Sequence, residues 1–371
     1  MKRYLALVIF WLSASVSFAQ GPAISKYYHF VAENPIKATI DLVVQGTNAQ
    51  GWIYIDDYKG FKQTYQVVGS FNNLTKDVSL KLSNETKSII FNGLLKSKGR
   101  VEGTFSGRVE ASSLQLALEE DYPLGSVSIN TISSNESRSL FNMKNSPIAS
   151  FSILYPELGD EVNTQSKSMI ANCIRKIFSD SINASVNPKA FIQQITARYF
   201  QDYFDMNREA YNPEFSTATF SWEKKYGFEV GRNDGGVLCL GFSTYAFTGG
   251  AHGMQVNTVQ NFDLVTGKSI ELQNIIDTAR FNQLTEILTL KLKKDLNLKL
   301  EDSLQNHGYF TNSITPTTNV WMLQDGLLFV YNPYEIAPYS FGRTQIFVGY
   351  DQVKHLLAET AVVKKVCNCL E

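Results

Sequence analysis

The stretch WMLQDGLLFVYNPYEIAPYSFGRTQIFVGY, from Trp321 to Tyr350, decides the fold of the last third of the chain. It contains the dipeptide Asp325-Gly326, which is typical of a tight turn. The apolar and aromatic run from Leu327 to Tyr331 follows, as expected of a buried strand. Proline has no N–H to give to a strand ladder, so Asn332-Pro333 ends this strand.

The segment beyond this strand predicts a loop from Tyr334 to Gly342. It holds two tyrosines, a glutamate, a second proline and a glycine within nine residues. Thr344 to Val348 resumes as a strand, and Asp351 to Leu357 predicts a short closing helix. A loop held between two buried strands is where a scaffold usually displays its specific groups.

Two blocks of sequence carry a resemblance to a known family. The blocks are Thr248-Gly249-Gly250-Ala251-His252 with Asn261-Phe262-Asp263-Leu264-x-Thr266-Gly267-Lys268, and Tyr331-x-Pro333-Tyr334-Glu335-Ile336-x-Pro338-Tyr339-x-x-Gly342. In order and spacing this resembles the exported bacterial domain of unknown function 3298. The resemblance covers residues from about Pro147 to Ala358.

What the resemblance implies is a place in the cell envelope. Domains of this kind occur in an anti-sigma factor that senses lysozyme and beside a peptidoglycan deacetylase catalytic domain. The resemblance therefore implies a protein partner of the lysozyme type, or peptidoglycan. The family has no established chemistry, so it implies no catalytic residue. This chain differs from the sensor because we expect no transmembrane helix after its N-terminal segment.

Length and charge bound the remaining possibilities. A chain of 371 residues is longer than one typical domain, so we expect two. Lysine and arginine number 34 against 35 acidic residues, which argues against a nucleic-acid binder. The sequence contains no HExxH, GxSxG, phosphate-binding glycine loop or metal-spaced cysteine and histidine set. We therefore expect neither a metal nor a cofactor.

The N-terminus, residues 1–19, has the pattern of a secretory signal peptide. Lys2 and Arg3 precede an apolar core, Tyr4 to Val16, and Ser17-Phe18-Ala19 predicts cleavage before Gln20. The alternative is a membrane anchor, but the apolar run is shorter than the roughly 20 residues that span a bilayer. The predicted location is periplasmic or extracellular.

Residues 20–120 predict an all-β antiparallel domain, either a barrel or a sandwich. Short runs rich in β-branched and aromatic residues recur at intervals of roughly ten residues, with turn chemistry between them. The predicted strands are 38–44, 51–55, 64–70, 78–82, 88–94, 100–105 and 114–118.

Residues 121–146 are rich in serine and asparagine and predict a mobile linker, although a strand around Ser126 to Ile132 could belong to either neighbour. Residues 147–371 predict an α+β domain of antiparallel strands with packed helices. It opens with a strand from Ile148 to Tyr155 that Pro156 is expected to stop. Helices are predicted at 163–179, 191–205 and 281–298, and further strands at 217–226, 228–232, 237–246 and 255–263.

The candidate ligand-binding residues are His252, Tyr334, Glu335 and Tyr339. His252 could titrate near neutral pH, or its ring could instead bond to backbone carbonyls in a structural joint. Glu335 could act as a general acid, or it could cap backbone N–H groups in its own loop. The two tyrosines could form an aromatic platform for a sugar ring or a protein, or could pack on the strands.

Other residues of the motifs are expected to shape the backbone. These structural residues are Gly249, Gly250, Asp263, Gly267, Pro333, Pro338 and Gly342. In an exported protein the four cysteines are also disulfide candidates. They are Cys173, Cys239, Cys367 and Cys369, whose three possible pairings the sequence leaves open.

Three functions follow from these candidates. The first is a non-enzymatic binding module of the cell envelope that recognises a lysozyme-like protein or peptidoglycan. The second is an envelope glycan hydrolase using Glu335 and His252, with Asp263 as a further carboxylate because glycosidases normally need two. The third is a carrier of a small apolar ligand inside the N-terminal β domain, which an empty cavity would favour and a filled interior would exclude. Of these, the sequence favours the binding module.

Overall fold

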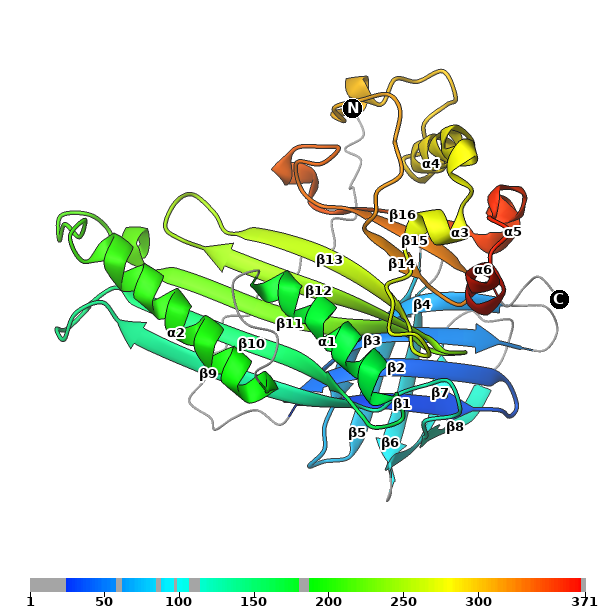
Figure 1. Cartoon of the computed structure of the whole chain (residues 1–371), viewed down its shortest axis with the longest axis horizontal. Helices are drawn as coiled ribbons and strands as arrows, with labels where there is room; N and C mark the ends of the chain where they lie inside the picture. The colour runs from blue at the N-terminus through cyan, green and yellow to red at the C-terminus, as the bar shows by residue number, and fades with distance from the viewer. Residues whose placement is uncertain are drawn as a thin grey trace.

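The computed structural model describes residues 25–57, 62–84, 88–96, 99–106, 114–179 and 187–367. The predicted signal peptide and Cys369 lie outside these ranges. Within them, no helix combines the length and the apolar character that a membrane span requires. Figure 1 shows an eight-stranded barrel, a five-stranded sheet with two long helices on one face, and a smaller C-terminal unit.

The N-terminal domain is a closed antiparallel barrel whose strands pair in chain order, so of the two predicted forms the barrel is confirmed. Its seven predicted strands are all present, and the prediction missed the first, β1, which pairs with both β2 and β8 and closes the barrel. The strands are β1 (Ser25–Ala32), β2 (Lys37–Gln45), β3 (Asn48–Asp56), β4 (Lys62–Phe71), β5 (Asp77–Ser83), β6 (Ser88–Leu95), β7 (Arg100–Ser106) and β8 (Leu114–Glu120).

Large side chains fill the barrel interior. Tyr65, Phe71 and Phe91 are fully buried there, and the Tyr28 ring stacks on Phe71 with centroids 4.8 Å apart. Aliphatic residues of all eight strands complete this core. A filled interior does not favour a ligand carrier, so the structure gives the third function no support.

The second domain is built on a five-stranded sheet with the order β13-β12-β11-β10-β9. Helices α1 (Thr164–Phe178) and α2 (Pro188–Asn207) connect β10 to β11, which run parallel, and both cover the same face of the sheet (Figure 1). Parallel neighbours need such a crossover, because a tight hairpin can join only antiparallel strands. The strands are β9 (Ile129–Ser139), β10 (Ile148–Leu158), β11 (Trp222–Asp234), β12 (Val237–Phe247) and β13 (Met254–Asp263).

Two expectations for this sheet were wrong. The serine-rich segment predicted as a linker contains β9, which pairs with β10 along its whole length at the edge of the sheet. Its outward residues face solvent, so serine and asparagine there do not signal mobile chain. Pro156 does not stop β10, because beyond Ile153 that strand has β9 as its only neighbour and needs fewer N–H donors.

The C-terminal unit is a three-stranded sheet with short helices and its own apolar core. The predicted strands 327–331 and 344–348 are present as β15 and β16, and the predicted helix 351–357 is divided between α5 and the 3₁₀ turn η6. The strands are β14 (Val320–Met322), β15 (Gly326–Tyr331) and β16 (Thr344–Gly349), and the helices are α3 (Leu272–Ile275), α4 (Phe281–Asp295), α5 (Tyr350–Val353) and α6 (Ala361–Val366). The 3₁₀ turns of this unit are η3 (Thr278–Arg280), η4 (Gln305–His307), η5 (Tyr339–Phe341) and η6 (Lys354–Leu356), whereas η2 (Thr217–Phe220) precedes β11 of the large sheet.

The disulfide candidates are separated by the sheet. Cys173 is a half-buried free thiol on α1, packed against the core beneath the helices. Cys239 is a buried free thiol on β12 and belongs to the cluster on the opposite face, so Cys173 and Cys239 do not pair with each other. Any pairing with Cys369 lies outside the described residues. Cys367 is buried in the core of the C-terminal unit. Burial raises the pKa of the Cys239 thiol to about 12, which keeps it protonated at neutral pH.

Candidate functional site

Three of the four candidate binding residues lie together. The His252 ring stacks on Tyr339 with centroids 4.0 Å apart and planes 19° apart, and Tyr334 lies against Tyr339 at 5.9 Å. His252 comes from the connection between β12 and β13, whereas the two tyrosines come from the loop between β15 and β16. Tyr334 is 52% exposed. We call His252, Tyr339 and Tyr334 the three-ring surface.

The backbone carbonyl group of Gly253 holds two rings of the three-ring surface in place. The Tyr339 hydroxyl donates to the carbonyl oxygen of Gly253 at 2.9 Å. His252 Nδ1 lies 3.1 Å from the same oxygen, which can only accept, so Nδ1 carries the proton in this contact. The ring thus bonds to a backbone carbonyl, as the structural alternative for His252 expects, and it also extends an aromatic stack.

Glu335 takes the structural role that the sequence offered as its alternative. One carboxylate oxygen accepts from the Asn332 N–H at 3.0 Å and the other from the Asn332 side-chain amide at 3.1 Å. Asn332 in turn bonds both backbone groups of Asn257 on β13. Glu335 therefore ties the loop to the large sheet, and both of its oxygens are engaged.

The carboxylate pair that the hydrolase reading needs is not assembled. Asp263 is the last residue of β13, and His252 lies just before the first residue of that strand, Met254, which is nine residues from Asp263. At about 3.3 Å per residue the two ends of β13 lie roughly 30 Å apart. Glu335 is bound through Asn332 to Asn257, six residues before Asp263, so the two carboxylates are on the order of 20 Å apart, beyond the separation found in glycosidases. Burial opposes ionisation of Asp263, but the Lys365 ammonium at 2.9 Å and the N–H groups of the following turn lower its pKa. Asp263 thus caps a turn, as its motif predicts.

Glycines of the motifs set the backbone around the three-ring surface. Gly249 has a φ of +80°, and a Cβ there would lie 2.0 Å from the carbonyl oxygen of Thr219, so only glycine fits. Gly342 closes the tyrosine loop at a φ of +68°. Gly250 and Gly267 also have positive φ, and Pro333 and Pro338 flank the turn that carries Tyr334.

Tyr334 itself has a φ of +71°, which is a strained conformation for a bulky side chain. We expect Tyr334→Gly to leave the free energy of unfolding unchanged or raised by up to about 1–2 kcal/mol, because glycine relieves the strain. The measurement is chemical denaturation monitored by circular dichroism. A loss of more than about 1 kcal/mol would mean that the ring stabilises the fold and is not held out for another purpose.

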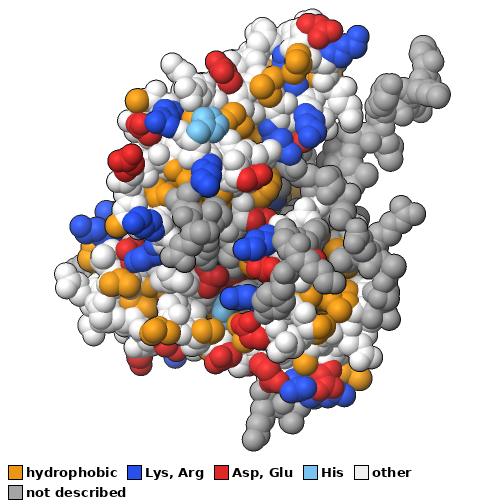
Figure 2. All heavy atoms as spheres, turned by 90° about the vertical axis from the view of Figure 1, so that its right-hand side faces the viewer, with side chains coloured by type: hydrophobic (Ala, Val, Ile, Leu, Met, Phe, Trp, Pro, Cys, Tyr) orange, Lys and Arg blue, Asp and Glu red, His pale blue; other side chains and the backbone are white. Residues whose placement is uncertain are grey.

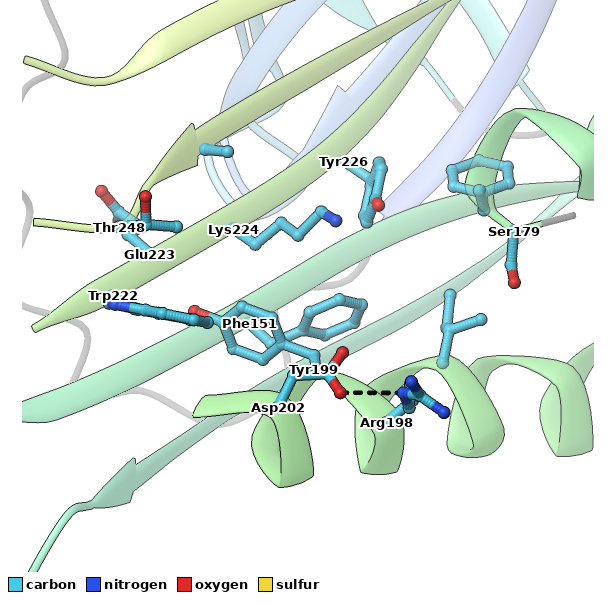
Figure 3. A pocket seen from close by; sticks show the side chains of 13 residues that line it. Phe151, Ser179, Arg198, Tyr199, Asp202, Trp222, Glu223, Lys224, Tyr226 and Thr248 are labelled. Carbon is cyan, nitrogen blue, oxygen red and sulfur yellow. Dashed lines mark hydrogen bonds and ion pairs between the residues drawn. The ribbon is translucent and has the colours of Figure 1, made fainter. Parts of the chain in front are cut away.

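A cavity of about 380 Å³ lies on the other face of the same end of the sheet. Figure 3 shows it between α2 and the strands β10 and β11, with aromatic rings and charged side chains projecting into it. Its described lining is Phe151, Phe178, Ser179, Ile195, Arg198, Tyr199, Asp202, Trp222, Glu223, Lys224, Tyr226, Ala246 and Thr248. Ile195 and Tyr199 have the helical spacing of core residues on α2, and periodicity alone does not separate a core face from a cavity wall.

Two family models match the parts of the chain that contain these features. Residues 273–351 match the family described as "Protein of unknown function (DUF3298)", and residues 143–255 match that described as "Deacetylase PdaC". The resemblance drawn from the two motif blocks is therefore confirmed. His252 and the whole cavity lining fall in the second match, and the tyrosine loop falls in the first. No curated protein matches the chain.

The chain also matches two solved structures of DUF3298 proteins. A DUF3298 member from Bacteroides fragilis NCTC 9343 is 23% identical, with a TM-score of 0.61 over 66% of this chain and 98% of its own. A second, from Pseudomonas aeruginosa PAO1, is 16% identical, with a TM-score of 0.46 over 64% of this chain and 96% of its own. The first likeness establishes that the fold is shared.

Proposed function

We propose that the chain is a non-enzymatic recognition module of the cell envelope that binds a lysozyme-like protein or peptidoglycan through the three-ring surface. The observation that carries the proposal is the clustering of three rings from two loops far apart in the sequence, with His252 stacked on Tyr339 and Tyr334 tilted against it. Stacked rings lose little conformational entropy on binding and offer apolar faces with polar edges. The strained backbone at Tyr334 fits a side chain held in position for contact.

The envelope setting is supported by the predicted signal peptide and by the match to a family named after a deacetylase. Figure 2 shows basic and acidic side chains interspersed over the face at the right-hand side of Figure 1, with no field of one sign. The whole chain is balanced in charge, with 34 basic and 35 acidic residues, which suits a partner bound by shape and by aromatic contact more than a polyanion bound by charge.

Removing the Tyr334 and Tyr339 rings is expected to weaken binding strongly. In calorimetric titration of residues 20–371 with c-type lysozyme and then with soluble peptidoglycan fragments, the double variant Tyr334→Ala/Tyr339→Ala should bind at least about 30-fold more weakly, since a central aromatic residue contributes about 2 kcal/mol or more. Glu335 and Asn332 are left intact, so the loop keeps its bonds to β13.

The matched control is Phe215→Ala, which removes an aromatic ring that is 61% exposed and outside the three-ring surface. It should bind as the unaltered protein does. If neither ligand binds the unaltered protein, or if the double variant binds as well as the control, the proposed function is wrong.

A further inference from the structure

We propose that the cavity between α2 and β11 is a second binding site, specific for a neutral pyranose sugar. It is separate from the three-ring surface, so its test does not depend on that proposal. Aromatic residues line much of it, among them Phe151, Tyr199, Trp222 and Tyr226. Their rings come from three different elements and lie in contact, with Phe151 5.3 Å from Tyr199 and Trp222 6.3 Å from Tyr199. Such a cluster offers faces for the C–H groups of a sugar ring.

An unsatisfied hydroxyl group points to a ligand with acceptor oxygens. The Tyr199 side chain is only 8% exposed, and its hydroxyl has no hydrogen-bond partner among the described residues. Leaving a buried hydroxyl unpaired is costly, and native proteins do so rarely. Burial and the neighbouring Tyr203 and Glu223 raise the pKa of Tyr199, so the group stays protonated and is available as a donor.

The charges around the cavity balance. Arg198 and Asp202 form an ion pair of 2.8 Å on α2, one turn apart, and Glu223 and Lys224 are consecutive on β11 (Figure 3). Two cations and two anions leave no net charge to select an ionic ligand. They do provide several donors and acceptors around an aromatic floor, which is the combination that a polyhydroxylated ring requires.

The size of the cavity fits a small sugar. Its volume of about 380 Å³ lies at the lower end of the range for small-molecule sites, roughly 300–1,000 Å³. Thr248, at the rim, is four residues from His252, so the cavity and the three-ring surface lie on either side of one loop. A glycan chain long enough to pass this loop would meet both sites.

The test is an NMR titration of residues 20–371. The probes are N-acetylglucosamine, its β1,4-linked dimer, glucose and glucuronic acid. We expect the neutral sugars to bind with a Kd on the order of 1 mM, as for ligands of this size, and to shift the indole N–H signal of Trp222 but not those of Trp52 and Trp321. Glucuronic acid should bind at least about fivefold more weakly than glucose. Preferential binding of the charged sugar would overturn the proposal.

Two single-atom variants make the test specific. Tyr199→Phe should weaken sugar binding about fivefold or more without lowering stability, because it removes a donor that has no partner in the fold. Tyr203→Phe is the matched control, since its hydroxyl is also buried and unpartnered but does not line the cavity. No binding of any neutral sugar at about 20 mM, or equal binding by the two variants, would overturn the proposal.

Discussion

Replacing Asp41 with alanine is expected to lower the free energy of unfolding by about 3–5 kcal/mol, because it leaves a buried cation without its anion. The Asp41 side chain is 2% exposed and lies on the outside of the barrel, where β2 meets the second domain. One of its oxygens accepts from the Tyr27 hydroxyl at 2.5 Å and contacts His29 Nδ1 at 2.7 Å. We call Tyr27, His29, Asp41 and Asn233 the Asp41 network.

The Asp41 network joins the two domains. Asn233, at the end of β11, donates to the Tyr27 hydroxyl at 2.9 Å. The same amide group donates to the carbonyl of Val127 at 2.7 Å and accepts from its N–H at 2.9 Å. Every member is buried, so loss of the carboxylate leaves both the Tyr27 hydroxyl and the His29 ring without their shared partner.

The pH dependence of stability provides a second readout of this network. Burial alone would lower the pKa of His29, but the Asp41 carboxylate, aided by Asp234 and Asp121, raises it above the ordinary value. A raised folded-state pKa gives stability that is complete below about pH 6.5, the unfolded value, and is lost as the pH rises through the folded value. The unaltered protein should therefore lose stability above about pH 6.5, and Asp41→Ala should not show this loss.

The matched control is Asp77→Ala, an exposed aspartate on β5 of the same barrel. It should change the free energy of unfolding by less than about 0.5 kcal/mol and keep the pH profile. Urea denaturation between pH 5 and pH 9 measures both quantities. A cost for Asp41→Ala below about 1 kcal/mol would contradict the assignment of Asp41 as the anion of a buried pair.

The strands of the barrel could be predicted because each is short, β-branched and bounded by turn residues. The hairpin at Gly235-Gly236 was also predictable, and both residues have positive φ, as two-residue hairpin turns require. Strand β9 was not, because a strand at a sheet edge with one solvated face has the composition of a linker. Closure of the barrel depends on the pairing of β1 with β8, a contact between residues about 90 positions apart that no local pattern records.

The candidate sites also divide into those that the sequence could predict and those that it could not. The residues of the three-ring surface could be predicted because both loops belong to the family motif. That the His252 ring stacks on Tyr339 is known only from the structure. The cavity and the Asp41 network were missed. Tyr199 shares the helical spacing of core residues, and no motif marks His29, because its partner, Asp41, lies on the neighbouring strand. Polar groups that meet across strands leave no periodic trace in the sequence.

The second large effect is expected for Trp321→Ala, which should lower the free energy of unfolding by about 3–5 kcal/mol, as removal of a large buried aromatic side chain does. The Trp321 indole lies over two glycines of the large sheet. A Cβ on Gly231 would be 2.4 Å from it and one on Gly241 would be 2.2 Å. Its other side meets Trp52 of the barrel, with centroids 5.4 Å apart. One side chain therefore packs the C-terminal unit, the sheet and the barrel together.

A double-mutant cycle with Gly241→Ala decides whether the indole is seated on that glycine. Alone, Gly241→Ala should destabilise the protein by about 1–3 kcal/mol, because the added methyl group overlaps the indole. In the Trp321→Ala background the same methyl enters the space left by the ring, so its cost should vanish or become a small gain. If Gly241→Ala cost the same in both backgrounds, the two residues would not be in contact. The control is Phe215→Ala, which removes an exposed aromatic ring and shows how much the free energy of unfolding changes when such a ring is lost from the surface.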